Sequence, residues 1–174
     1  MTPDYKPEIL TDKSRLPEIY HLRVAAYENS PKSIFVNREI FPDGMSDELD
    51  ERETTLHYII KDNDKIVASA RIAVLNDIKD IDEPVEENEL PLGRPFAYYT
   101  RLVVHPDYRG LGLSAIMDKV RSDYLRAHKD IHFALAWATS HRKQSLLNVG
   151  FRIFTEYEYE WEGNTVRLDG YILS

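Results

Sequence analysis

The sequence contains no cysteine among its 174 residues. Without thiols the chain cannot form disulfides or thiolate metal sites, and it cannot use a cysteine nucleophile. The Gly-x-Ser-x-Gly elbow of serine hydrolases is also missing. Covalent catalysis through either group is therefore not expected, and a reaction on this chain would proceed by direct transfer between substrates.

Long apolar runs and an excess of positive charge are missing too. No apolar run approaches the roughly 18 residues of a membrane span, and the first ten residues, MTPDYKPEIL, do not resemble a signal peptide. The formal charge of −8 disfavours nucleic acid and anionic membranes as partners. We expect a cytoplasmic protein that binds small molecules or cations, folded as one compact domain over residues 1–174.

The most informative segment runs from Phe96 to Leu125 and reads FAYYTRLVVHPDYRGLGLSAIMDKVRSDYL. An apolar strand is followed by a glycine-containing turn and then by an amphipathic helix. The first amides of a helix lie at the positive end of its dipole and bind phosphate groups. Glycine lets a ligand approach the backbone, and arginine offers a fork of donors. The predicted phosphate-binding residues are Arg109, Gly110, Leu111, Gly112, Leu113 and Ser114.

This turn resembles the cofactor signature of the GNAT superfamily of N-acetyltransferases, which is Arg or Gln, two residues, Gly, one residue, then Gly or Ala. Here the positions are Arg109, Gly112 and Ser114, with a mild departure at the last. A second buried strand, Phe133 to Ala138, and the pair Gly150-Phe151 after the last helix extend the resemblance. It covers the last eighty residues well and the first ninety loosely.

The resemblance implies a fold and an activity. The fold would be α/β (α+β), with a mixed central sheet flanked by helices and two central strands that splay apart. Leu102, Val103 and Val104 would hold the pantetheine arm through their backbone. The activity would move an acetyl group from acetyl-CoA, without a metal, directly to the primary amine of a small molecule or peptide.

Patterns elsewhere predict the remaining elements. A first helix ends before Pro31, and its apolar positions are Leu16, Ile19, Tyr20, Val24 and Tyr27. Residues 56–60 and 66–75 form a hairpin, and residues 34–53 form loop and short helix. Residues 151–161 and 165–173 form a second hairpin, whose exposed edge is a candidate surface for a homodimer. The order is helix, hairpin, strand, helix, strand, helix, hairpin.

The connection over residues 76–95 is long and acidic. Loops of this length inside a compact domain are often functional. One interpretation is a lid or an acidic rim that attracts a cationic amine, and the other is a solvated run of charge.

The resemblance leaves the catalytic residues open. Many GNAT members place a glutamate on the strand before the phosphate turn and a tyrosine four residues before Gly-Phe. This chain has Leu146 at the tyrosine position and no carboxylate between Tyr98 and Arg101. The candidate substitutes are Tyr98, His141 and Ser140, against alternatives of sheet packing for Tyr98 and helix capping for His141. Tyr157 and Tyr159 line an acceptor pocket or belong to the core.

A second resemblance involves the upstream half, which is similar to the acyl-homoserine-lactone and N-acyl amino acid synthases of the same fold. The matching positions are Arg23, Asp47, Asp50, Thr55, His57, Tyr58, Arg71, Thr100 and Arg101. It implies transfer of a longer acyl chain to an amino acid-like amine. The charged residues would otherwise form a structural ion-pair network, because buried arginine needs carboxylate partners. A non-catalytic acyl-CoA-binding module is the third alternative.

Overall fold

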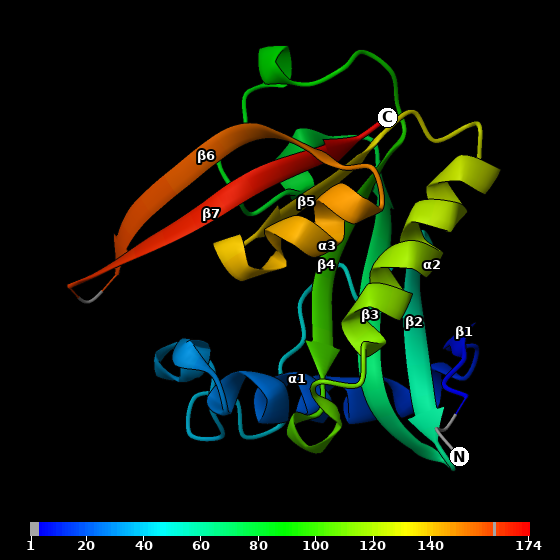
Figure 1. Ribbon diagram of the computed structural model, residues 1–174, viewed down its shortest axis with the longest axis vertical. Coiled ribbons are helices and arrows are strands. Elements are labelled where there is room, and N and C mark those ends of the chain that lie inside the picture. The colour runs from blue at the N-terminus through cyan, green and yellow to red at the C-terminus, as the bar shows by residue number, and fades with distance from the viewer. Residues whose placement is uncertain (1–3, 162) are drawn as a thin grey trace. The chain divides into compact units, whose positions relative to one another are not determined.

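The computed structural model describes residues 4–161 and 163–174 (Figure 1). The strands of these residues form one seven-stranded sheet in the order β1-β2-β3-β4-β5-β7-β6. The sheet is mixed, because β4 pairs with β5 in parallel whereas β1 with β2, β5 with β7, and β6 with β7 are antiparallel. The expected α/β architecture with flanking helices is thereby confirmed.

The elements follow the predicted order with one addition. The strands are β1 (Pro7–Ile9), β2 (Thr55–Asp62), β3 (Lys65–Leu75), β4 (Phe96–Val104), β5 (Ala134–Ala138), β6 (Arg152–Trp161) and β7 (Asn164–Leu173). The helices are α1 (Leu16–Glu28), α2 (Leu113–Ala127) and α3 (Lys143–Asn148). β1 was not predicted, because three residues carry no periodicity; it exists through its pairing with β2.

Two compact units make up the fold. The first consists of the chain up to Ile72 together with Arg101–Met117, and the second of Ala73–Thr100 together with Asp118–Ser174. The single-domain organisation of residues 1–174 stays a prediction. None of the described helices is both long enough and apolar enough to span a membrane.

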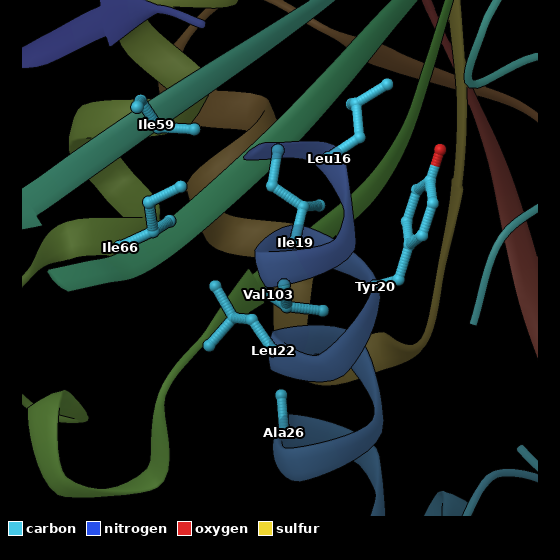
Figure 2. Close-up of a cluster of buried hydrophobic side chains, with 8 residues drawn as sticks. All are labelled: Leu16, Ile19, Tyr20, Leu22, Ala26, Ile59, Ile66 and Val103. Carbon is cyan, nitrogen blue, oxygen red and sulfur yellow. The ribbon is translucent and has the colours of Figure 1, made fainter. Parts of the chain in front are cut away.

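The apolar core of the first unit lies where α1 packs on the sheet (Figure 2). Ile19 and Leu22 lie on the side of α1 that is nearer to Ile59 of β2 and Ile66 of β3, and Leu16 belongs to the same buried cluster. Ile19 is completely buried. Because burying one such side chain contributes about 1.5–3 kcal/mol, this face fixes α1 on the strands.

A network of buried charges adjoins this core in the first unit. Asp50 is 1% exposed, and its carboxylate accepts hydrogen bonds from Arg23 Nη1 and Nη2, both at 2.7 Å, and from Arg71 Nη1 at 2.8 Å. The backbone N–H of Asp47 donates a fourth, at 2.9 Å. The carboxylate is therefore saturated, as a buried charge requires.

Asp47 extends the network to the central strand. Its Oδ1 accepts from Arg71 at 2.5 Å, and its Oδ2 accepts from Arg101 Nη2 at 2.8 Å. Burial alone would raise the pKa of Asp47, but the hydrogen bonds and charges of Arg71 and Arg101 outweigh it and lower this pKa far below its usual range. Three guanidinium groups thus share two carboxylates.

His57 closes the network as a neutral group. Its Nε2 lies 2.9 Å from the carbonyl oxygen of Asp50, so this nitrogen carries the proton and donates. Burial lowers the pKa of His57, and the charges of Arg23 and Arg71 lower it further, against the opposing effect of Asp50.

The second unit is organised around β5. β4 pairs with it from Ala97 to Tyr99, and on its other side β7 and β6 continue as a long hairpin (Figure 1). On β6 the side chains of Tyr157 and Tyr159 are half-buried whereas Glu156, Glu158 and Glu160 are exposed. One face of this part of β6 is therefore partly covered and the other is solvated.

Removing the central carboxylate should destabilise the fold strongly. We expect Asp50→Asn to lower the free energy of unfolding by about 3–5 kcal/mol, because the buried guanidinium of Arg23 would lose its carboxylate partner and that of Arg71 would lose its pairing with Asp50. Urea denaturation followed by circular dichroism measures this. The control is Glu48→Gln, a nearby exposed carboxylate that should change stability by less than about 0.5 kcal/mol. Equal losses of stability in Asp50→Asn and Glu48→Gln would contradict the role of Asp50 as the carboxylate that compensates the buried arginines.

The same network predicts how stability depends on pH. Asp47 and Asp50 have lowered pKa values when folded, so in acid the unfolded chain binds more protons and the free energy of unfolding falls as pH drops below about 5. His57 acts in the same direction from about pH 6.5 downward, because its folded pKa is lowered. Urea denaturation between pH 7 and pH 4 should show a shallower dependence for Asp50→Asn than for the unaltered protein. If the free energies of unfolding of the two proteins fell equally with decreasing pH, other groups would be responsible for the loss of stability in acid.

Candidate active site

The predicted phosphate turn lies in the first unit, between the end of β4 and the start of α2. Gly110 and Gly112 have φ values of 78° and 77°, in the left-handed region that favours glycine. A β-carbon built on either residue would meet no atom within 4 Å. The backbone therefore favours glycine at both positions, and both glycines face open space.

Helix α2 begins directly at this turn. The carbonyl oxygen of Gly112 accepts hydrogen bonds from the amides of Ala115 and Ile116, at 3.0 and 3.2 Å. Leu113 is buried and Ser114 is half-buried, so packing holds the first residues of the helix in place. The amides of its first turn lie at the positive end of the helix dipole, where an anion binds.

Arg109 has a role that the sequence did not predict. Its Nη1 donates to the carbonyl oxygen of Asn29 at 2.9 Å, and its Nη2 donates to that of Ala26 at 2.6 Å. These carbonyls belong to the end of α1, where cations are favoured by the helix dipole. The guanidinium anchors the turn on α1, and its contact with phosphate stays a prediction.

Two further contacts fix the entrance of the turn. The hydroxyl of Tyr108 donates to Asp62 Oδ2 at 2.7 Å, and the amide of His105 donates to the carbonyl of Val67 at 2.8 Å. Burial and the neighbouring charge of Lys65 lower the pKa of His105, which favours its neutral form. Contacts with α1, β2 and β3 thus hold the turn in place.

The strand that leads into the turn is irregular. Arg101, a non-glycine residue inside β4, has a φ of 55°, which costs of order 1–3 kcal/mol. Its guanidinium is paired with Asp47, which offsets this strain. Val103 is buried, while Leu102 and Val104 are half-buried. Their backbone contact with a pantetheine arm stays a prediction.

The second unit contains Tyr98, the first candidate for catalysis. Its ring is 2% exposed, and its hydroxyl donates a hydrogen bond to Glu83 Oε2 at 2.5 Å. Glu83 is half-buried and comes from the acidic connection over residues 76–95. Trp137 of β5 meets Tyr98 edge-on, with ring centroids 6.1 Å apart. A carboxylate therefore does reach the strand that has none of its own between Tyr98 and Arg101.

The two tyrosines predicted to bind substrate lie in the same unit. The rings of Tyr157 and Tyr159 are stacked, with centroids 5.3 Å apart. Burial raises the pKa of Tyr159, and the neighbouring Tyr157 and the negative charge of Glu83 raise it further. Glu83 thus accepts a hydrogen bond from Tyr98 and raises the pKa of Tyr159 through its charge. Tyr157 is linked to them through its stacking on Tyr159.

His141, the second catalytic candidate, is exposed, and its Nδ1 lies 2.7 Å from Thr139 Oγ1. The turn that carries it is positioned by buried Asp118, which accepts hydrogen bonds from Arg142, from Arg121 and from Ser145. Leu146 is buried and serves packing.

Glu83 is the functional candidate that the sequence did not single out. A run of acidic residues has no periodicity that marks one member as half-buried. The available signal was indirect. The strand before the turn lacks the glutamate that many members of the resembled family place there, and the acidic connection over residues 76–95 had no assigned role. In the described part of the chain no three His, Asp or Glu side chains are grouped so as to hold a metal ion.

Comparisons with known proteins place this geometry in context. The model of the acetyltransferase (GNAT) family matches residues 16–151. No curated protein matches the chain in sequence.

Solved structures share the fold at low sequence identity. The ribosomal-protein-S18-alanine N-acetyltransferase from Escherichia coli has a TM-score of 0.65 at 17% identity, covering 97% of this chain and 92% of its own. FeeM, an N-acyl amino acid synthase from uncultured soil microbes, has a TM-score of 0.68 at 11% identity, covering 99% and 91%. An acyl-CoA N-acyltransferase from Pseudomonas aeruginosa has a TM-score of 0.62 at 15% identity, covering 98% and 99%. Since the family model spans most of the sequence, the chain belongs to the acetyltransferase (GNAT) family.

Proposed function

We propose that the protein is an N-acyltransferase that moves an acetyl group from acetyl-CoA directly to a primary amine. The observation that carries this proposal is the turn from Arg109 to Ser114, in a chain of the GNAT family. Its two left-handed glycines face open space at the start of α2. Family membership supports acyl transfer, and the turn supports a donor with a pyrophosphate.

The residues of the turn fit coenzyme A. Backbone amides at the start of α2 would bind the pyrophosphate, and Ser114 adds a hydroxyl. The strand segment Leu102–Val104 would bind the amide groups of the pantetheine arm through its backbone. When bound, acetyl-CoA supplies an activated thioester carbonyl.

Direct transfer requires that one proton be removed from the acceptor amine. A lysine-like amine has a pKa near 10.4, so at pH 7 it arrives as an ammonium ion and must lose a proton before it can attack. Tyr98 and His141 are the proposed catalytic residues. Tyr157 and Tyr159 would contact the acceptor, which we propose to be a small-molecule or peptide amine.

A longer-chain synthase is the second candidate, and a specific observation favours it. The network of Arg23, Asp47, Asp50, Arg71 and Arg101 forms as one unit. These are the positions by which the sequence resembles the acyl-homoserine-lactone and N-acyl amino acid synthases. The fold shared with an N-acyl amino acid synthase supports this candidate as well.

Calorimetric titration with acetyl-CoA, octanoyl-CoA and palmitoyl-CoA, with free CoA as reference, separates the candidates. For an acetyltransferase we expect binding of acetyl-CoA with no gain in affinity for the longer chains. Affinity that rises with chain length would favour the synthase, since each buried methylene contributes about 0.8 kcal/mol. Absence of binding by every thioester would contradict both. An assay against peptides with amino-terminal alanine, polyamines and amino acids then tests transfer, and binding without transfer to any amine would indicate a non-catalytic module.

Substitution of one glycine should separate ligand binding from stability. Gly112→Ala places a β-carbon where the pyrophosphate would lie, so we expect acetyl-CoA to bind at least about tenfold more weakly, a loss of about 1.4 kcal/mol. Gly163→Ala is the matched control, because Gly163 has a φ of 78° and an equally open surrounding but lies in the β6–β7 turn. Both substitutions should cost about 1–2 kcal/mol of stability through backbone strain. Unchanged affinity in Gly112→Ala would refute the placement of the pyrophosphate.

A further inference from the structure

Among the described residues, Asn63 and Arg101 are the two non-glycine residues with a positive φ, and their settings differ. Asn63, with a φ of 54°, lies in the turn between β2 and β3, where asparagine often adopts this conformation. Arg101, with a φ of 55°, lies inside β4, where a φ of about −120° to −140° is usual. The conformation of Arg101 fits neither its residue type nor its element, so its surroundings must hold it.

Asp47 holds the side chain of Arg101. Its Oδ2 accepts hydrogen bonds from Arg101 Nη2 at 2.8 Å and from Arg101 Nε at 3.2 Å. Its Oδ1 accepts from Arg71 Nη1 at 2.5 Å and from the backbone N–H of Leu49 at 3.0 Å. Because Arg71 and Leu49 already fix the carboxylate, pairing with Arg101 costs Asp47 little further side-chain entropy.

The pair of Asp47 and Arg101 lies at the edge of the buried charge network. The side chains of Asp50 and Arg71 are each 1% exposed, whereas those of Asp47 and Arg101 are 25% and 21% exposed. An ion pair that water reaches contributes less to stability than one whose loss would leave a buried charge alone. The inner members of the network therefore stabilise the fold, and the outer pair acts on the backbone of β4.

The backbone of Arg101 sets the orientation of the residues that follow it. Because φ and ψ are the two free rotations of each residue, the φ of Arg101 determines where the peptide groups of Leu102–Val104 point. The far end of this segment is fixed by the amide of His105, which donates to the carbonyl oxygen of Val67 at 2.8 Å. The segment proposed above to bind the pantetheine arm is thus constrained at both ends.

We propose that Asp47 and Arg101 are positioning residues for the acyl-CoA donor. Their ion pair holds Arg101 in the left-handed conformation, and this conformation presents the backbone of Leu102–Val104 to the pantetheine arm. The proposal assigns neither side chain a contact with the donor. It rests on the proposed function, because it takes the donor to be an acyl-CoA bound along this strand.

Two substitutions of one residue separate the backbone conformation from the guanidinium. Arg101→Ala and Arg101→Gly both remove the ion pair, but glycine adopts a positive φ without the steric cost that alanine has. In calorimetric titrations we expect CoA to bind Arg101→Ala at least about tenfold more weakly than the unaltered protein, equal to about 1.4 kcal/mol. Arg101→Gly should stay within about threefold of the unaltered protein. The phosphoadenosine diphosphate fragment of CoA, which lacks the pantetheine arm, should bind all three proteins equally.

Asp47→Asn tests the other partner. Asparagine keeps the size of the side chain and one acceptor oxygen but removes the charge, so CoA should bind about three- to tenfold more weakly. The same substitution in the Arg101→Gly protein should cause no further loss, because glycine does not need the ion pair. Glu18→Gln is the matched control, since Glu18 pairs with Arg15 at 2.6 and 2.9 Å but the φ of Arg15 is an ordinary −90°. It should leave the affinity for CoA unchanged.

The first step of the proposal can be measured without a ligand. Backbone ¹³C chemical shifts of Arg101 in nuclear magnetic resonance spectra report whether this residue is left-handed. We expect Asp47→Asn to move these shifts toward extended values and Glu18→Gln to leave them in place. Unchanged shifts of Arg101 in Asp47→Asn would overturn the proposal. If Asp47→Asn does not fold, the two Arg101 variants still decide, because they leave Asp47 paired with Arg71.

The remaining outcomes are distinct from one another. Equal losses of CoA affinity in Arg101→Ala and Arg101→Gly would show that the guanidinium acts through its own contacts, and the proposal would fail, as it would if neither variant lost affinity. A parallel loss for the fragment without the arm would also refute a role limited to the strand.

The transfer assay separates this proposal from the proposed function. If CoA affinities follow the expected pattern but the unaltered protein transfers acetyl to no amine, the proposed function fails and the positioning role stands. If transfer occurs but both Arg101 variants bind CoA equally, the positioning role fails and the proposed function stands. If the unaltered protein binds no CoA, both fail.

Discussion

A buried carboxylate that must be neutralised sets the conditions for much of the first unit. Asp50 is removed from water, so its charge is tolerable only with the four donors that surround it. Those donors come from α1, from β3 and from the segment before β2. Three parts of the chain that are distant in sequence are therefore held in one geometry by a single group.

The same network extends to the strand that leads to the phosphate turn. Asp47 pairs with Arg71 and also with Arg101, whose backbone adopts a left-handed conformation inside β4. Strain of this kind persists only where the surroundings compensate for it. The shape of β4 before the predicted phosphate turn is thus coupled to the ion pairs of the network.

Local sequence patterns predicted the main helices and the strands other than β1, whereas long-range contacts determined the roles of individual side chains. The periodicity of Leu16, Ile19 and Tyr20 predicted α1, and the glycines at 110 and 112 predicted the turn, because both signals lie within a few residues. The anchoring of Arg109 on α1 joins residues 80 and 83 positions apart, and no local pattern contains that information. The contact between Glu83 and Tyr98 was hidden for the same reason.

The alternation on β6 also bears on how copies of the molecule meet. β6 is the last strand in the order of the sheet, and an edge strand can accept a strand from another chain. Glu156, Glu158 and Glu160 are exposed along it. A second β6 added in antiparallel fashion would bring carboxylates opposite carboxylates, and like charges in cross-strand pairs repel one another. The acidic face therefore works against a sheet continued from one molecule into the next.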